Sequence, residues 1–217
     1  MFVKICGIKR KEDALAAARF GADAVGFLVG QKYPSNDFIS AQEASELIKI
    51  IPRPVTSIIV THLNNAEKIF EIVRMAEPKG IQLHGEITIT EAQKLRKSFP
   101  ALKLCKSIHI QDGMNKNDIE EWYGLADAFV ADTVNPATGQ IGGTGIAHDW
   151  LLSREICRMS EIPLILAGGL NPGNIGKAIR QVRPFGVDVN SGVKSRNGFK
   201  DHRLMKDLIR LAKNTSA

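Results

Sequence analysis

Short β-rich runs alternate with amphipathic helical runs along the whole chain, and this alternation limits the possible folds more than any other feature. The β-rich runs cover residues 2–7, 24–29, 55–60, 80–84, 102–107, 128–132, 163–167 and 186–189. The helical runs cover residues 11–21, 41–51, 65–76, 90–99, 116–124, 148–160, 172–182 and 200–214. Because about 200 residues is the lower end of the size of a barrel, these eight units predict a single (β/α)8 TIM barrel. We expect one domain over residues 1–217.

A faint internal repeat agrees with this fold. The stretches GADAVGF, LADAFVAD and FGVDVNSG each place Gly or Ala before an acidic residue and a hydrophobic strand. An open doubly wound sheet is the main alternative. It is disfavoured because KICGIKRKE, at the end of the first predicted strand, has one glycine where a GxGxxG turn is typical.

Composition and charge argue against several classes of partner. The net charge is +6, but Lys and Arg alternate with Glu and Asp, and the two Trp and two Tyr do not interleave with basic residues. This pattern predicts no nucleic-acid binding and only a mild attraction for small anions. The longest apolar runs, such as IPLILAGGL, are too short to cross a membrane. Three scattered cysteines and no apolar leader at the N-terminus favour a reducing, cytoplasmic location.

The alternation of polar and aliphatic residues predicts which side chains point into the barrel. Residues predicted to face outward are Val3, Ile5, Ile81, Leu83, Leu102 and Leu104, and those predicted to face inward are Lys4, Cys6, Gln82, His84, Lys103 and Cys105. In the sixth and eighth strands, Asp132 shares the face of Val130 and Asp188 lies opposite its valine neighbours.

Four residues with side chains suited to catalysis or binding fall near the carboxyl ends of strands, where the active sites of barrel enzymes lie: Cys6, His84, Asp132 and Ser191. Cys105 is better explained as barrel filler, and Cys157 as packing on a helix. His84 is open to either reading, as a functional group or as a hydrogen-bonded wall residue.

Three glycine-bearing loops follow the sixth, seventh and eighth predicted strands: QIGGTG, LAGGLNPGN and VNSGVKSRNG. Glycine lets backbone N–H groups approach a ligand closely, and late-strand loops are the usual phosphate position in these barrels. The three loops together predict a phosphorylated small-molecule substrate.

The chain resembles the phosphoribosylanthranilate isomerase family of tryptophan biosynthesis nearly from end to end. The resemblance lies in VKICGI, GADAVGF, IQLHG, ADT, GGTG followed by DW, LAGGLNPGN and VDVNSGVKSRNGFKD. It implies an Amadori rearrangement of N-(5-phosphoribosyl)anthranilate to 1-(2-carboxyphenylamino)-1-deoxyribulose 5-phosphate. No metal and no organic cofactor would be needed.

The resemblance also implies roles for individual residues. Cys6 would be the general base and Asp132 the general acid. The site would then have to lower the pKa of the Cys6 thiol and raise that of Asp132. His84 and Asp188 would contact the substrate, although a structural hydrogen bond is an alternative for Asp188. The phosphate would be held by backbone at Gly143, Thr144, Gly168, Gly169, Ser191 and Gly192.

Several positions depart from the family pattern. The family usually has SPR after the second strand, with an arginine for the anthranilate carboxylate, where this chain reads GQKYPSNDF. Lys32 could replace that arginine as a point charge or could simply be solvated. In addition, this chain has IAHDW where the family often has KTFDW, and VNSGVK where the family has VSSGVE. A paralogue acting on another phosphorylated sugar and a noncatalytic phosphometabolite-binding barrel are the alternatives, and the chain could be a monomer or a homodimer.

Overall fold

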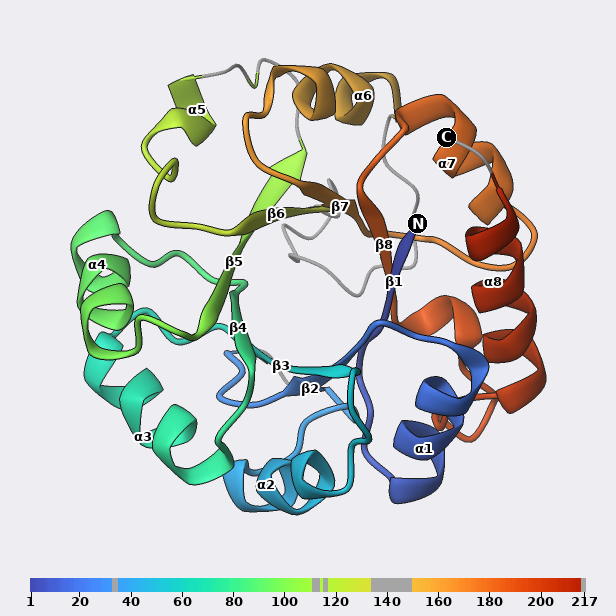
Figure 1. The fold of residues 1–217 in the computed structure, drawn as a ribbon, viewed down its shortest axis with the longest axis horizontal. Coiled ribbons are helices and arrows are strands. Elements are labelled where there is room, and N and C mark those ends of the chain that lie inside the picture. The colour runs from blue at the N-terminus through green and yellow to red at the C-terminus, as the bar shows by residue number, and fades with distance from the viewer. Residues whose placement is uncertain (33–34, 111–113, 115–116, 134–149, 216–217) are drawn as a thin grey trace.

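The computed structural model describes residues 1–32, 35–110, 114, 117–133 and 150–215, and its strands form one closed parallel barrel in the order β1 to β8. Figure 1 looks along this barrel, with the strands at the centre and the helices around them. The strands are β1 (Phe2–Ile5), β2 (Ala24–Leu28), β3 (Thr56–Thr61), β4 (Gly80–Leu83), β5 (Lys103–Ile110), β6 (Ala128–Thr133), β7 (Leu164–Leu166) and β8 (Gly186–Val189). The predicted (β/α)8 fold is confirmed.

The helices follow the strands as the sequence predicts. They are α1 (Lys11–Phe20), α2 (Ala41–Lys49), α3 (Ala66–Ala76), α4 (Ile89–Ser98), α5 (Asn117–Glu120), α6 (Trp150–Met159), α7 (Ile175–Val182) and α8 (His202–Asn214), with a 3₁₀ turn, η1 (Ser191–Val193), after β8. Local signals fix several helix starts. Ser40 and Glu43 form a capping box at α2, and the Asp201 carboxylate accepts hydrogen bonds from two backbone N–H groups of α8.

The fifth helix is shorter than the predicted 116–124 segment. After α5 the backbone continues in tight turns, with Trp122 N–H donating to Ile119 O and Tyr123 N–H to Glu120 O. Gly124 then adopts a φ of 75°, which ends any helical continuation. The short α5 therefore has a local backbone cause.

Two layers of side chains form the interior. The larger cluster lies between strands and helices and includes all six side chains predicted to face outward from the first, fourth and fifth strands. A smaller cluster fills the barrel itself: Cys105, Ala128, Val130, Ile165 and Ala167, with Phe2 packed against it. The alternation thus predicted the two faces correctly, and Cys105 is barrel filler as expected. The exception is Lys103, which begins β5 and is exposed, because the amino-terminal end of the strand reaches solvent.

Candidate active site

The carboxyl ends of parallel strands meet at one rim of a closed barrel, and most candidate residues lie there. Cys6 directly follows β1, His84 follows β4 and Asp132 is the penultimate residue of β6. Gly168 and Gly169 follow β7, and Ser191 and Gly192 begin η1 after β8. Gly143 and Thr144 lie outside the described residues. The structure therefore gathers the described catalytic and phosphate candidates on the same rim.

Cys6 sits in a tight site that two glycines make possible. Its side chain is 7% exposed, and its backbone N–H donates to Val189 O at 2.9 Å. A Cβ atom on Gly26 would lie 2.8 Å from the Cys6 Sγ atom, and one on Gly7 would lie 2.5 Å from Asn190 Oδ1. Glycine at both positions leaves the thiol the space it occupies.

Burial dominates the electrostatics of the thiol. It raises the pKa of Cys6 to about 11, although the cations Lys4 and Lys200 act in the opposite direction and Asp188 adds to the rise. The expectation that the surroundings lower the pKa of this thiol is therefore wrong for this structure. The two lysines are present, but their attraction for the thiolate is smaller than the cost of removing it from water.

Lys4 and Lys200 are both buried close to Cys6, and the sequence analysis gave neither a role in the site. Lys4 Nζ donates to Asp188 Oδ2 at 2.6 Å and to Gln82 Oε1 at 2.8 Å. Burial lowers and Asp188 raises the pKa of Lys4, and the net result is a pKa above its ordinary value. Lys200 Nζ donates to the backbone and side-chain oxygens of Asn190, and burial lowers the pKa of Lys200 to about 8. The KD pair that ends the last motif was the signal that could have identified Lys200.

Asp188 lies inside the barrel, as predicted, and its contacts are structural in part. One carboxylate oxygen accepts the hydrogen bond from Lys4. The other, Oδ1, is buried and has no hydrogen-bond partner among the described residues. Asp188 thus holds Lys4 in place through one oxygen, while its other oxygen stays buried.

His84, after β4, and Asp132, on β6, approach each other across β5. His84 Nε2 lies 3.9 Å from Asp132 Oδ2, while His84 Nδ1 lies 2.8 Å from Ser107 Oγ. Burial, with the neighbouring His62 and His109, holds the pKa of His84 well below its ordinary value, so the ring is neutral.

Two further histidines, which the sequence analysis did not single out, join His84 at the rim. The ring of His62, after β3, lies 4.9 Å from that of His84, and the ring of His109, on β5, lies 5.8 Å from it, both edge to face. Burial lowers the pKa of His62, and that of His109 to about 4. Their position at the ends of three successive strands was the available signal. Within the described ranges, no group of His, Cys, Asp and Glu side chains is arranged to hold a metal ion.

The loop after β2 carries a buried carboxylate in place of the arginine typical of the family. Asp37 is 3% exposed; it pairs with Lys194, the residue after η1, and accepts a hydrogen bond from Asn190 Nδ2 at 3.0 Å. Lys9 Nζ lies 3.9 Å from the other oxygen of Asp37. Lys32, the proposed substitute for the arginine, is exposed. Burial is the main cause of the lowered pKa of His62, and the charge of Lys32 lowers it further. The structure therefore places Lys32 on the side of the histidines.

The two described phosphate loops pack against each other. Gly168 and Gly169 adopt φ values of 81° and 63°, and Asn174 Nδ2 donates to Gly169 O at 2.9 Å. A Cβ atom on Gly192 would lie 1.8 Å from Leu170 O, so the loop after β8 can only approach the loop after β7 with a glycine there. The glycines thus bring two backbone segments together.

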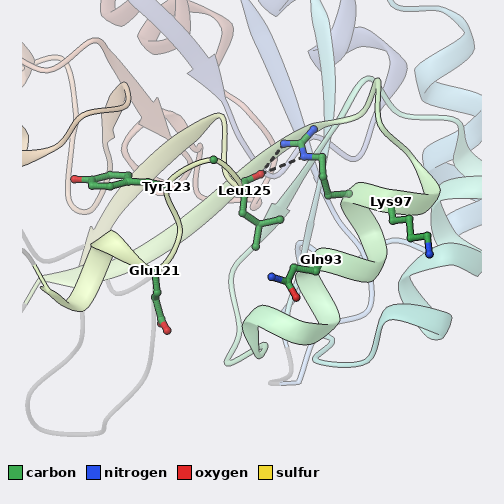
Figure 2. A pocket seen from close by; sticks show the side chains of 7 residues that line it. Gln93, Lys97, Glu121, Tyr123 and Leu125 are labelled. Carbon is green, nitrogen blue, oxygen red and sulfur yellow. Dashed lines mark hydrogen bonds between the residues drawn. The ribbon is translucent and has the colours of Figure 1, made fainter.

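A hollow elsewhere on the molecule is separate from this rim. Figure 2 shows Gln93, Lys97, Glu121, Tyr123 and Leu125 around it. These residues come from α4 and from the segment before β6, and helix-to-strand segments lie at the amino-terminal rim. Arg96 donates to Leu125 O at 2.7 Å and to Asp127 Oδ2 at 2.8 Å, which gives this region a structural function.

Comparison with known proteins assigns the chain to a family. The family model described as N-(5′-phosphoribosyl)anthranilate (PRA) isomerase matches residues 3–210. The chain belongs to the PRA isomerase family. It is 42% identical to N-(5′-phosphoribosyl)anthranilate isomerase 2 of Methanosarcina mazei over 214 residues, which cover 99% of this chain and 95% of the relative.

Solved PRA isomerase structures are also similar to this one. Monomers made from the dimeric Thermotoga maritima PRA isomerase match with a TM-score of 0.79 at 33% identity, covering 98% of both chains. A PRA isomerase in complex with reduced 1-(o-carboxyphenylamino)-1-deoxyribulose 5-phosphate matches with a TM-score of 0.80 at 34% identity, again covering 98% of both chains.

The family match includes every candidate residue on the rim, from Cys6 to Gly192. The resemblance inferred from the sequence motifs is therefore confirmed as PRA isomerase membership. These matches do not favour the two alternatives, a paralogue for another sugar phosphate and a noncatalytic binding barrel. In the described part of the chain, no helix has both the length and the apolar character that a membrane span requires.

Proposed function

We propose that this PRA isomerase catalyses the Amadori rearrangement of N-(5-phosphoribosyl)anthranilate to 1-(2-carboxyphenylamino)-1-deoxyribulose 5-phosphate, with Cys6 as general base and Asp132 as general acid. The observation that carries the proposal is the position of both residues at the carboxyl rim of one barrel, beside the glycine loops after β7 and β8. The reaction belongs to tryptophan biosynthesis.

The two groups act in sequence. Asp132 donates its proton to the furanose ring oxygen, and the C1′–O bond breaks as the nitrogen lone pair forms a Schiff base. Cys6 thiolate then removes the C2′ proton, and the electron pair of that C–H bond moves toward the iminium nitrogen to give an enolamine, which tautomerises to the ketone. Both proton transfers need groups close to the sugar.

The buried lysines support the base. Because burial raises the pKa of Cys6, a thiolate forms there only with cationic help, and Lys4 and Lys200 both stabilise it. We assign the two lysines a supporting role at the moment when Cys6 is deprotonated.

The remaining candidates would bind the substrate. Backbone at Gly168, Gly169, Ser191 and Gly192, together with Gly143 and Thr144, would hold the phosphate. His84 and Asp188 would contact the sugar, and Lys32 would attract the anthranilate carboxylate. All three cysteines are free, which supports a cytoplasmic location. Monomer and homodimer both remain compatible with the proposal.

The test follows the decay of the fluorescence of freshly made phosphoribosylanthranilate. The unaltered protein should consume it, and Cys6→Ser and Asp132→Asn should each lower turnover at least about 100-fold, the usual loss for a general base or acid. Cys157→Ser, at a half-buried cysteine on α6, is the matched control and should be fully active. An unimpaired Cys6→Ser or Asp132→Asn protein would remove that residue from the mechanism. Inactivity of the unaltered protein would disprove the proposed reaction.

A further inference from the structure

An unbroken line of hydrogen bonds runs around the inner wall of the barrel from β8 to the end of β4. Asp188 Oδ2 accepts from Lys4 Nζ at 2.6 Å, and Lys4 Nζ also donates to Gln82 Oε1 at 2.8 Å. Gln82 Nε2 lies 3.0 Å from Ser107 Oγ, which lies 2.8 Å from His84 Nδ1. All five side chains are buried.

Lys4 can cross the barrel because β2 offers no side chain in its way. A Cβ atom on Gly26 would lie 3.0 Å from Lys4 Cε. The lysine therefore passes over Gly26 and reaches Gln82 on β4.

The donor and acceptor of each hydrogen bond in this line follow from the ammonium group of Lys4. An ammonium group only donates hydrogen bonds, so the Gln82 amide oxygen must face Lys4. The amide nitrogen then faces Ser107 and donates to its oxygen. Among the described residues, the remaining partner of Ser107 Oγ is His84 Nδ1.

The hydrogen of the Ser107 hydroxyl group decides the state of His84. Ser107 is 1% exposed, and a buried donor without an acceptor costs about 1–3 kcal/mol. The hydroxyl group therefore donates to His84 Nδ1, which must be unprotonated to accept. Since burial and the neighbouring histidines and lysines lower the pKa of His84, the ring is neutral and carries its one proton on Nε2.

We propose that Lys4, Gln82 and Ser107 set the tautomer of His84 and that its Nε2–H is a positioning donor for the Asp132 carboxyl group. This inference rests on the proposed role of Asp132 as general acid. His84 Nε2 faces Asp132 Oδ2 at 3.9 Å, and a donor there leaves the other oxygen to carry the acidic proton. It also stabilises the carboxylate once that proton has gone to the substrate. Catalytic hydrogen bonds are often this long in a ligand-free structure and tighten in the reacting complex.

The most direct test reverses the donor and acceptor roles of Ser107 with an almost isosteric change at Gln82. In Gln82→Glu the new side chain accepts from Lys4 but no longer donates to Ser107, so the Ser107 hydroxyl group should donate to the carboxylate instead. Its oxygen would then accept from His84, whose proton should move to Nδ1. Long-range ¹H–¹⁵N NMR spectra of protein labelled at histidine report the protonated nitrogen directly, and His84 is assigned by the loss of its signals in His84→Asn.

We expect the Nε2–H tautomer in the unaltered protein and the Nδ1–H tautomer in Gln82→Glu. Ser107→Ala, which removes a single oxygen, should lose the strict preference and serves if Gln82→Glu does not fold. Ser57→Ala is the matched control, because Ser57 is equally buried but bonds the backbone N–H of Lys79 outside this line. The same tautomer in the unaltered protein and in Gln82→Glu, or Nδ1–H in the unaltered protein, would overturn the proposal.

Two further readouts separate this inference from the proposed reaction. Asp132→Asn should shift the His84 Nε2–H resonance whether or not the protein is active, and an unshifted resonance would refute the contact. In an active protein, Gln82→Glu should lower kcat about tenfold, the equivalent of one lost hydrogen bond, and leave KM within about twofold. An unchanged kcat after a proven tautomer switch would refute the positioning of Asp132.

Discussion

At the scale of single residues, the chemistry of Cys6 depends on a balance between burial and two cations. Burial destabilises the thiolate relative to the thiol, whereas Lys4 and Lys200 stabilise it. The balance in this structure favours the thiol, and the pKa of Cys6 is raised to about 11. A general base with this pKa is in its active form for only a small fraction of the time at neutral pH.

The raised pKa predicts how the thiol reacts with an alkylating reagent. Only the thiolate reacts, so the rate of Cys6 alkylation by iodoacetamide should rise steadily from neutral pH toward about 11. Mass spectrometry of the peptide that contains Cys6 measures this rate separately from the other cysteines. Lys200→Met should slow the reaction below about pH 8, where Lys200 is still charged and stabilises the thiolate. A rate that levels off near neutral pH would contradict the raised pKa.

At the scale of elements, a salt bridge joins two loops of the rim. The loop after β2 supplies Asp37, and the residue that follows η1 is Lys194, which pairs with it. The family pattern places an arginine in the first loop and a glutamate in VSSGVE, so this chain has the opposite charge in both loops. Lys194 is therefore engaged by Asp37 rather than left for the substrate carboxylate.

Binding of that carboxylate predicts different effects for two lysines. Lys32→Ala should raise KM for phosphoribosylanthranilate about fivefold, the equivalent of about 1 kcal/mol for a partly solvated charge pair. The double variant Asp37→Asn/Lys194→Met removes the internal pair without a change in net charge and should leave KM within about twofold. Steady-state kinetics with the fluorescent substrate measures both. The opposite pattern would move the carboxylate site from Lys32 to Lys194.

At the scale of the whole molecule, the barrel closes where its first and last units meet. Strand β1 pairs with β8 from Phe2 to Ile5, and helix α1 packs beside α8 (Figure 1). Asp13 on α1 joins the two helices, because its carboxylate pairs with Arg10 at 2.7 Å and with His202 Nε2 at 2.9 Å. It also accepts from the backbone N–H of Lys200. This carboxylate therefore ties the two ends of the chain together.

Asp13→Asn should lower the free energy of unfolding by about 1–3 kcal/mol, because buried partners lose a charged acceptor. Burial alone would raise the pKa of Asp13, but Arg10, His202 and the Lys200 N–H together hold it below its usual value. The stabilisation is thus present above the pKa of the unfolded chain and is lost as pH falls through the lower folded value.

Urea unfolding at several pH values measures this contribution. The difference between the unaltered protein and Asp13→Asn should be largest near neutral pH and should shrink below about pH 4. Asp207→Asn is the control, since Asp207 lies on the surface of α8, 3.6 Å from Arg210, where an ion pair contributes little. A difference that persists unchanged into acid would show that Asp13 does not act through its charge.

The sequence by itself determined the barrel, the order of its elements and the inward direction of Lys4, Gln82 and Asp188. These features follow from hydrophobic periodicity, which is written in neighbouring residues. It also determined the rim on which Cys6 and Asp132 lie, because that rim is set by strand direction.

Only the tertiary structure decided which distant side chains meet and what those meetings do to their chemistry. The salt bridge between Asp37 and Lys194 joins residues far apart in the chain, and the three histidines meet only because β3, β4 and β5 are neighbours. The pKa of Cys6 likewise depends on burial by the entire barrel rather than on KICG alone. Periodicity is local, whereas desolvation and charge pairing depend on the closed three-dimensional arrangement.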